Sequence, residues 1–399
     1  MQNRSYPIDV FRGLALVFIV VNHVAGSVLA WGTSRNFGIS DASEQFVFLA
    51  GLVTALAYTG LAHKRGVSAA DHRFRHRAWE IYCAFLVTAA LMFMSGGVLL
   101  WLGMETPAFH GSEIKAFVAA PGRAMFEVVT LQRQPFFSDI LPMYVFFALL
   151  TPYWMRLARR SWKILLVLSL ALWMLAPWLA HVLPSVTGPW TFNPFAWQLV
   201  FTLGLIVGTH RHLLEMGTQR CRRILTALAV AIVLSGAVFL LFSYHENMRQ
   251  LFVSSWFDHG VATFSKSNAS LVRVANFVAM GWLVYLAAQR GWLDALLRRL
   301  TWLATVGRNG LVCFVGGTVI SILAETVSHL LAGGTPDAAS ALLADMLAIT
   351  SLLALAAVAD VWKHRSRKEV HEHLPMPAAT WPGGTMTERG FRTVARVPD

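Results

Sequence analysis

Apolar residues gather along the chain into long blocks that short polar segments separate. Ten of these blocks have about 17 to 24 residues, which is enough for a helix to cross about 30 Å of hydrocarbon. The ten predicted helices cover residues 8–30, 42–62, 78–101, 139–155, 162–180, 194–209, 224–244, 271–288, 302–325 and 339–361. This pattern predicts an all-α polytopic integral membrane protein, with a transmembrane domain over 1–362 and a disordered cytoplasmic tail over 363–399.

Three connecting segments have a less simple pattern. Residues 102–138 and 245–270 mix apolar and polar positions, so parts of them could re-enter the membrane or lie on its surface. Residues 291–302 (GWLDALLRRLTW) combine apolar and charged side chains and could form an interfacial amphipathic helix.

Composition supports a membrane protein. Of the 399 residues, 56% are apolar and only 14% are charged, whereas soluble proteins carry about 25% charged residues. A soluble enzyme, a coiled coil and a disulfide scaffold are therefore excluded. Cys83, Cys221 and Cys313 lie far apart without metal-ligand spacing, so we predict no metal site.

The distribution of positive charge predicts the orientation. If the N-terminus is cytoplasmic, 24 of the 33 Lys and Arg residues lie in or beside inside segments and six lie in outside segments. This bias follows the positive-inside rule and places both termini in the cytoplasm. It also accounts for the net charge of +12, so we expect no nucleic-acid partner.

The first predicted helix carries Arg12, Asn22 and His23. A charged side chain inside a bilayer costs at least about 2.5 kcal/mol, which makes each such residue a functional candidate. Arg12 and His23 are about three turns apart, so they share one face and are separated by roughly 16 Å along the axis. The pair indicates a path with a cationic inner mouth and a titratable outer end. The residues alone also allow a snorkelling anchor at Arg12 and a core histidine at His23.

Acidic residues begin two helices on the predicted outer side. Glu44 and Asp41 stand at the start of the second helix, close in depth to His23, and Asp139 stands at the start of the fourth. A carboxylate beside a histidine stabilises the imidazolium that a catalytic base forms. We therefore predict that Glu44 orients His23. A carboxylate placed only to favour the helix dipole is the other interpretation.

Basic residues in three further places are candidates for substrate binding. Arg308 and Asn309 fall in the inner half of the ninth helix, and Lys266 and Arg273 form an outer cluster suited to a polar acceptor. The inside segment 63–77 suits an anionic, phosphate-bearing ligand, although the positive-inside bias explains it equally well. Its basic residues are Lys64, Arg65, Arg73, Arg75 and Arg77.

Several of these segments carry a resemblance to a known family. The spacing of Arg12 and His23, followed by FVFLAG at 46–51, resembles the integral-membrane acyltransferase-3 superfamily. IDVFRGLAL, DILPMYVFF, NPFAWQLVFTLG and VGRNGLVCF resemble the osmoregulated periplasmic glucan succinyltransferases (OpgC-type) within it. The resemblance runs in order over roughly residues 5–325.

The resemblance implies an enzyme of the bacterial inner membrane. It would move a succinyl group from cytoplasmic succinyl-CoA, the donor substrate, to sugar hydroxyls of periplasmic glucans, with no permanently bound cofactor. The superfamily's catalytic histidine falls on His23, its arginine on Arg12 and its acidic residue on Glu44. Ala50 replaces the usual serine of the phenylalanine block, and the segment 257–277 is longer than the family pattern.

These residues suggest a working hypothesis. The CoA nucleotide would bind near 63–77, its pantetheine arm would pass Arg12, and His23 would deprotonate the glucan hydroxyl while Arg308 or Asn22 stabilises the oxyanion. Direct transfer and a covalent acyl-histidine relay both stay open. The alternatives are an acetyltransferase of another surface polysaccharide and a transporter or flippase for an anionic acyl or glycan substrate. Membrane lipid is the expected surrounding, and the oligomeric state is open.

Overall fold

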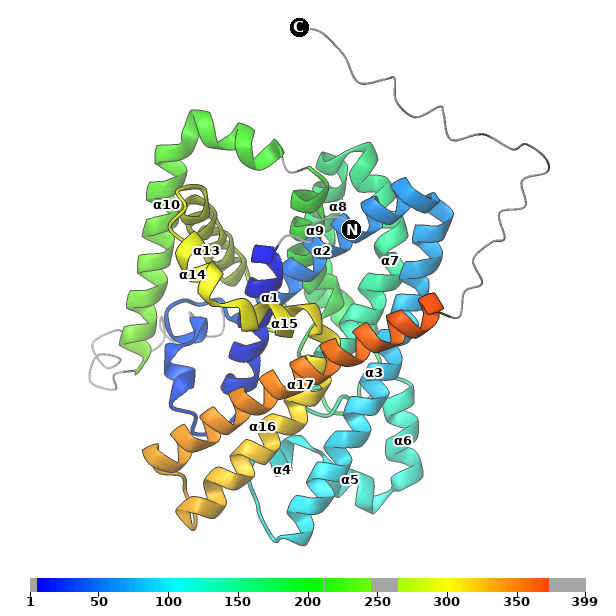
Figure 1. Cartoon of the computed structure of the whole chain (residues 1–399), viewed down its shortest axis with the longest axis vertical. Coiled ribbons are helices and arrows are strands. Elements are labelled where there is room, and N and C mark those ends of the chain that lie inside the picture. Colours follow the sequence, from blue (N-terminus) through cyan, green and yellow to red (C-terminus); the bar gives the residue numbers. More distant parts are fainter. Residues whose placement is uncertain (1–5, 211, 245–264, 373–399) are drawn as a thin grey trace, which may run out of the picture. The chain divides into compact units, whose positions relative to one another are not determined.

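The computed structural model describes residues 6–210, 212–244 and 265–372, and these residues fold into helices (Figure 1). No β-strand occurs in these three ranges, so the predicted all-α class is confirmed. The long helices are α1 (Tyr6–Asn22), α2 (Ala42–Arg65), α3 (Val67–Trp101), α7 (Ile140–Arg160), α8 (Trp162–Leu179), α9 (Pro194–Thr209), α10 (His212–Tyr244), α13 (Leu271–Gln289), α16 (Gly310–Ala332) and α17 (Ala338–Glu372). Shorter helices are η1 (Leu29–Gly32), η2 (Ser34–Asn36), α4 (Pro107–Gly111), α5 (Ile114–Ala119), α6 (Pro121–Val129), η3 (Ala180–Val182), α14 (Asp294–Arg299) and α15 (Thr301–Arg308).

Each of the ten predicted blocks contains a helix. Within the described part of the chain, eight helices are long and apolar enough to cross a membrane: α2, α3, α7, α8, α10, α13, α16 and α17. The other two, α1 with 17 residues and α9 with 16, are shorter. The connections α2–α3, α7–α8 and α9–α10, which were all predicted to be cytoplasmic, lie toward the same end of the bundle (Figure 1).

Two predicted helices end early or are interrupted. The first ends at Asn22 instead of continuing to residue 30, and two short 3-10 turns follow it. The ninth, predicted over 302–325, is broken at Asn309 into α15 and α16. The Asn309 side chain donates to the carbonyl oxygens of Thr305 and Ala356, so side-chain hydrogen bonds stabilise the interruption and join it to α17.

The basic segment 63–77 was expected to be a connecting segment, and this expectation is wrong. α2 extends to Arg65 and α3 begins at Val67, so only Gly66 interrupts the two helices. Gly66 has a φ of 86°, a conformation that side chains with a Cβ rarely adopt. The basic side chains therefore project from two helix ends.

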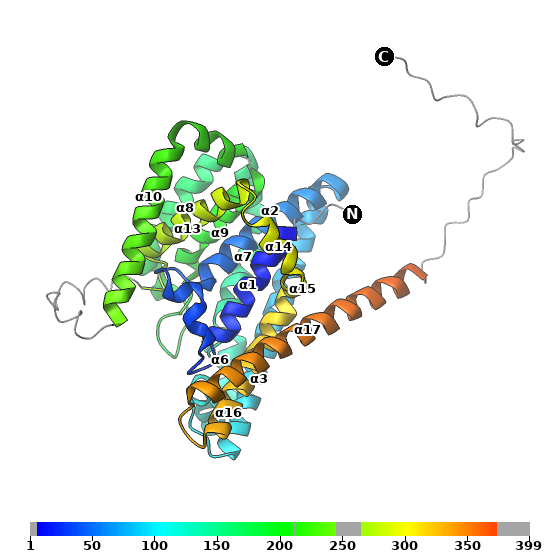
Figure 2. The ribbon, with the colours of Figure 1, turned by 60° about the vertical axis from the view of Figure 1, so that its left-hand side comes forward.

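Glycines let the helices that carry the site approach closely. A Cβ at Gly13 of α1 would lie 1.9 Å from the Leu303 carbonyl oxygen, and one at Gly307 of α15 would lie 1.9 Å from that of Asp9. α1 and α15 lie side by side in both ribbon views (Figure 2). Small residues at helix crossings allow the two backbones to approach closely in membrane proteins. These two glycines therefore allow α1 and α15 to pack against each other.

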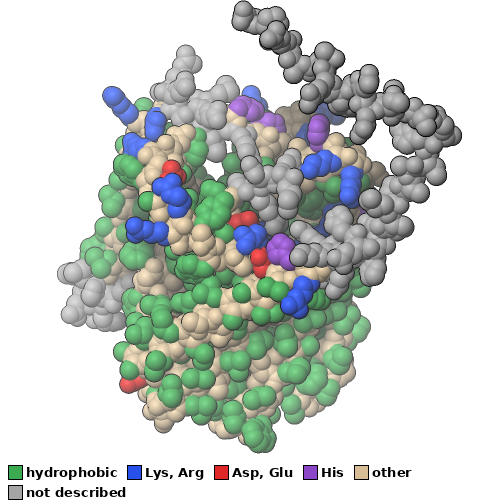
Figure 3. All heavy atoms as spheres, in the orientation of Figure 1, with side chains coloured by type: hydrophobic (Ala, Val, Ile, Leu, Met, Phe, Trp, Pro, Cys, Tyr) green, Lys and Arg blue, Asp and Glu red, His purple; other side chains and the backbone are tan. Residues whose placement is uncertain are grey.

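The surface and the longer connecting segments have the following features. Hydrophobic side chains cover most of the face in Figure 3, and Lys, Arg and His side chains gather toward its upper part. The segment 102–138 contains α4, α5 and α6, and the segment 291–302 contains the short helix α14. Of 245–270, only residues from 265 are described.

The internal contacts divide the chain into residues 1–359 and 360–399. In the second unit the helix continues to Glu372, beyond the predicted start of the tail at 363, and residues 373–399 lie outside the described residues.

Candidate active site

A cavity of about 350 Å³ lies between α1, α16 and the segments that precede α2 and α7. α1 and its C-terminal end contribute Leu16, Ile19, Val20, Asn22 and His23, and α16 contributes Phe314, Gly317, Thr318 and Ser321. The remaining wall consists of Arg35, Asp41, Ala42, Ser43, Phe136, Phe137, Asp139, Ile140, Thr191, Phe192 and Lys266. The cavity wall thus combines apolar side chains with a few polar and charged ones, the usual make-up of a small-molecule site.

His23 stands in this wall one residue beyond the end of α1. Its Nδ1 lies 2.5 Å from the carbonyl oxygen of Ile19, and a carbonyl can only accept, so Nδ1 carries the proton. Edge-on contacts with Phe136 and Phe137, at 5.6 and 4.4 Å between ring centres, fix the plane of the imidazole. In the neutral ring, Nε2 is consequently the atom with a free lone pair, which is the form that a general base needs.

Asn22 also lines the cavity, as its place in the sequence suggested. Its Oδ1 accepts a hydrogen bond of 2.8 Å from the Thr33 hydroxyl, which ties the end of α1 to the turn before η2. The amide nitrogen of Asn22 therefore remains as a donor next to His23.

Asp41 and Glu44 form the N-terminal cap of α2 in a reciprocal arrangement. Asp41 accepts from the Ser43 amide at 2.7 Å, and Glu44 accepts from the Asp41 amide at 2.9 Å. This capping box satisfies backbone donors that the first turn leaves without partners. The local sequence from Asp41 to Glu44 is therefore sufficient to explain why α2 begins here.

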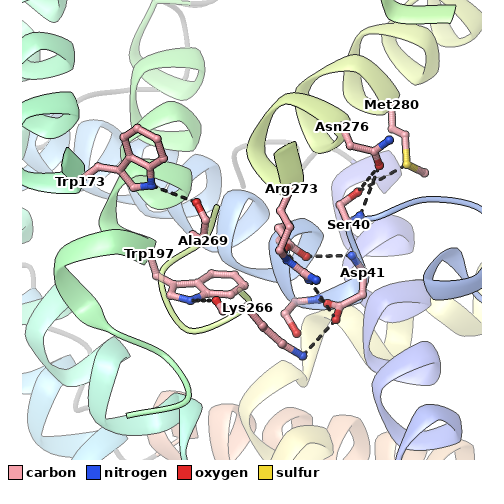
Figure 4. A network of polar contacts seen from close by, with 11 residues as sticks. Ser40, Asp41, Trp173, Trp197, Lys266, Ala269, Arg273, Asn276 and Met280 are labelled. Carbon is pink, nitrogen blue, oxygen red and sulfur yellow. Dashed lines mark hydrogen bonds and ion pairs between the residues drawn. The ribbon is translucent and has the colours of Figure 1, made fainter. Parts of the chain in front are cut away.

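A partly buried ion network extends from this cap to α13 (Figure 4). Arg273 lies 2.7 Å from Glu44 and 3.3 Å from Asp41, and Lys266 lies 3.0 Å from Asp41. Burial alone would raise the pKa of the Asp41 carboxyl, but Lys266 and Arg273 hold it well below its usual range. The expected cluster of Lys266 and Arg273 is thus real, and its immediate partners are carboxylates of the protein.

The expected contact between Glu44 and His23 is absent. Glu44 is fully buried, its two carboxylate oxygens bind Arg273 and the Asp41 amide, and it does not line the cavity. His23 is instead oriented by a backbone carbonyl of its own helix. Of the two carboxylates of this cap, Asp41 is the one that shares the cavity wall with His23.

Asp139 also lines the cavity, at the residue before α7. The side chain is 7% exposed, and burial raises its pKa to about 6 against the lowering effects of the Thr191 side chain and of Lys266. A carboxyl with such a pKa can exchange a proton near neutral pH.

Arg12 lies on α1 one turn before Leu16, which lines the cavity, and is itself not part of the cavity wall. A Cβ at Gly310 would lie 2.8 Å from its Nη2 atom, so the glycine leaves the room that the guanidinium group fills. Arg12 is also close enough to Tyr144 to interact electrostatically with it. The Tyr144 hydroxyl is buried and has no hydrogen-bond partner within the described part of the chain.

Arg308 and Asn309 are not part of the cavity wall. Arg308 donates to the Thr305 hydroxyl at 3.0 Å, and Asn309 stabilises the break between α15 and α16. A direct contact of either residue with a substrate in this cavity is therefore not supported.

The five basic residues of 63–77 separate into two groups. Arg73 and Arg77 each bind Glu80, at 2.7 and 2.8 Å. Lys64, Arg65 and Arg75 are exposed, with no ion pair to any residue that the structure describes. The last three are better placed to receive an external anion.

Sequence reasoning missed several wall residues. Arg35, Phe136, Phe137 and Thr191 come from connecting segments, where no periodicity indicates which residues will line a cavity. Tyr144 lies within the motif DILPMYVFF, but an apolar block gives no sign that one hydroxyl will lack a partner. No group of three or more metal-ligating side chains occurs among the described residues.

Comparison with known families agrees with this arrangement. The family described as OpgC protein matches residues 4–364, which is nearly the whole described chain. A search of curated proteins and a search of solved structures each found no match. The family match indicates a membrane transferase that modifies glucans, and the resemblance seen in the sequence is confirmed: the chain belongs to the OpgC family.

Proposed function

We propose that this protein is an O-acyltransferase of the bacterial inner membrane that transfers a succinyl group from cytoplasmic succinyl-CoA to hydroxyl groups of periplasmic glucans. The observation that carries the proposal is the cavity whose wall His23, with Nδ1 bound to Ile19, shares with Asp41, Asp139 and Lys266. A base beside polar side chains that can hold a sugar is what ester formation from a thioester requires. Membership of the OpgC family supports the glucan as acceptor.

In the proposed reaction, Nε2 of His23 takes the proton of a glucan hydroxyl as its oxygen attacks the thioester carbonyl. The tetrahedral intermediate collapses with cleavage of the carbon–sulfur bond, and the imidazolium returns the proton to the sulfur of CoA. The products are the glucan ester and free CoA. A base in this position contributes about 10²–10⁴ in rate.

Asn22 is the proposed donor to the oxyanion. Its carboxamide oxygen is occupied by Thr33, which leaves its nitrogen to donate beside His23. A preorganised amide donor is typically worth about 10²–10³ in rate. Arg308, the other candidate, lies outside the cavity wall.

The proposed donor path approaches from the opposite end. Arg12 and the Tyr144 hydroxyl, which has no hydrogen-bond partner within the described part of the chain, are the proposed contacts for polar groups of the pantetheine arm. The exposed Lys64, Arg65 and Arg75 are candidates for the phosphates of CoA. Charged side chains of the cavity wall, Asp139 and Lys266 among them, are candidates to bind the hydroxyl groups of the glucan.

The test uses the purified full chain in detergent, incubated with succinyl-CoA and unmodified periplasmic glucan. The expected result is a glucan with the mass and the added negative charge of succinyl esters, together with free CoA. A glucan that gains only acetyl groups from acetyl-CoA identifies the acetyltransferase alternative. Unchanged glucan, combined with movement of glucan or acyl donor across proteoliposomes, contradicts the proposal and supports the transporter alternative.

A further inference from the structure

Two cationic side chains line the cavity beside His23. Arg35 belongs to η2 and Lys266 precedes α13, so they reach the wall from segments far apart in the sequence. Both are close enough to His23 to interact electrostatically with it. The wall around the proposed base therefore carries positive charge as well as carboxylates.

The surrounding charges neutralise one of these cations but not the other. Lys266 binds Asp41 at 3.0 Å and stacks over the ring of Phe192 at 5.4 Å. Arg273 is held between Asp41 and Glu44, so these two carboxylates and two cations balance. Arg35 is exposed, and no carboxylate within the described ranges forms an ion pair with it.

We propose that Arg35 binds the free carboxylate of the acyl group and thereby selects a dicarboxylic acyl donor over a monocarboxylic one. This inference rests on the proposed function and assigns the determinant of its donor specificity. The terminal carboxylate of a succinyl thioester lies two methylene groups beyond the carbonyl under attack. An acyl group whose carbonyl is next to His23 must therefore place this carboxylate elsewhere on the same cavity wall.

The chemistry of the guanidinium group fits this role. Arginine presents donors in a planar fork that matches both oxygens of a carboxylate, and it stays charged at any working pH. An acyl chain that ends in a methyl group offers this fork no partner while covering it from water. Lys266 adds positive potential on the same wall, but its ammonium group is already occupied by Asp41.

The test compares two donors of equal chain length, succinyl-CoA and butyryl-CoA, which differ by a terminal carboxylate against a methyl group. The variants are Arg35→Gln, Arg35→Lys and the control Arg123→Gln, whose side chain is 77% exposed on α6 and does not line the cavity. The measurement is kcat/KM for each donor with the same neutral glucan. Size-exclusion elution and thermal unfolding in detergent report whether each variant is folded.

We expect the wild type and Arg123→Gln to prefer succinyl-CoA strongly. Arg35→Gln should lower the ratio of the two kcat/KM values by about tenfold or more, the usual effect of one hydrogen bond to a charged group. Arg35→Lys should restore part of the ratio because it keeps the charge without the fork.

An unchanged ratio in a folded Arg35→Gln protein overturns the inference while leaving the proposed function intact. So does an equal loss with both donors, which would assign Arg35 to the acceptor or to CoA itself. A wild type that transfers neither acyl group contradicts the proposed function instead. The two failures are therefore distinguishable.

Discussion

The guanidinium group of Arg273 donates to the Glu44 carboxylate over 2.7 Å, and both side chains are buried. This pair joins the first turn of α2 to α13, two segments that are more than 200 residues apart. Glu44 therefore positions Asp41 in the cavity wall, through Arg273 and the capping box. His23 takes its orientation from the carbonyl of Ile19.

The buried pair leads to a prediction about stability. Glu44→Ala leaves Arg273 buried with only Asp41 as a counter-charge, and breaking such a pair costs on the order of 3–5 kcal/mol. We expect a clearly lower unfolding temperature in detergent. Glu105→Ala is the control, because Glu105 is 68% exposed and its ion pair with Lys115 should contribute less than about 1 kcal/mol.

A second Glu44 variant tests whether Glu44 is a positioning residue or forms a catalytic dyad with His23. In Glu44→Gln, any remaining transfer should keep the acid limb of its pH profile, since Glu44 does not contact His23. A profile shifted to lower pH in a folded variant would show that Glu44 supports the imidazolium directly and would contradict this assignment.

His23→Gln should abolish acyl transfer without unfolding the protein. Loss of a general base typically lowers the rate about 10²–10⁴-fold, measured as glucan ester formed per folded molecule. His181→Gln is the matched control, because His181 is an exposed residue of η3 that does not line the cavity. A His23 variant with more than about a tenth of the wild-type rate would remove this residue from the chemistry.

Arg12 should act on the donor more than on the chemical step. Arg12→Ala is expected to raise KM for acyl-CoA roughly tenfold or more, and Arg12→Lys should recover part of the loss. Gly310→Ala should have a smaller effect in the same direction, because the added methyl group displaces the flexible end of Arg12. Unchanged KM values in all three variants would make Arg12 an anchor of the helix end only.

The raised pKa of Asp139 leads us to expect that the stability of the fold depends on pH. Burial raises its pKa to about 6, above the ordinary value near 3.8, so between these pH values the folded state binds more proton than the unfolded state. Stability contributed by this group is full below about pH 4 and is lost as pH rises through about 6. Asp139→Asn should flatten that part of the curve of unfolding temperature against pH. A curve with the wild-type slope would show that another group titrates there.

Much of the architecture follows from local properties of the sequence. The length of each apolar block and the asymmetry of Lys and Arg depend only on residues that are close together in the chain, and eight of the predicted blocks form helices long enough to span a membrane. The placement of His23 and Asn22 in one wall follows from their position at the end of one helix. The capping box of Asp41 and Glu44 likewise depends on only four consecutive residues.

The tertiary structure alone decided which charges meet. The sequence suggested Glu44 as the partner of His23 because the two residues share a predicted depth, but depth does not determine which way a helix face turns. Arg273 and Lys266 reach the cap of α2 from α13 and the segment before it, and Arg35 reaches the cavity from η2. Such contacts depend on how whole helices rotate and cross, through close approaches such as that of Gly13 to Leu303, and no local pattern specifies them.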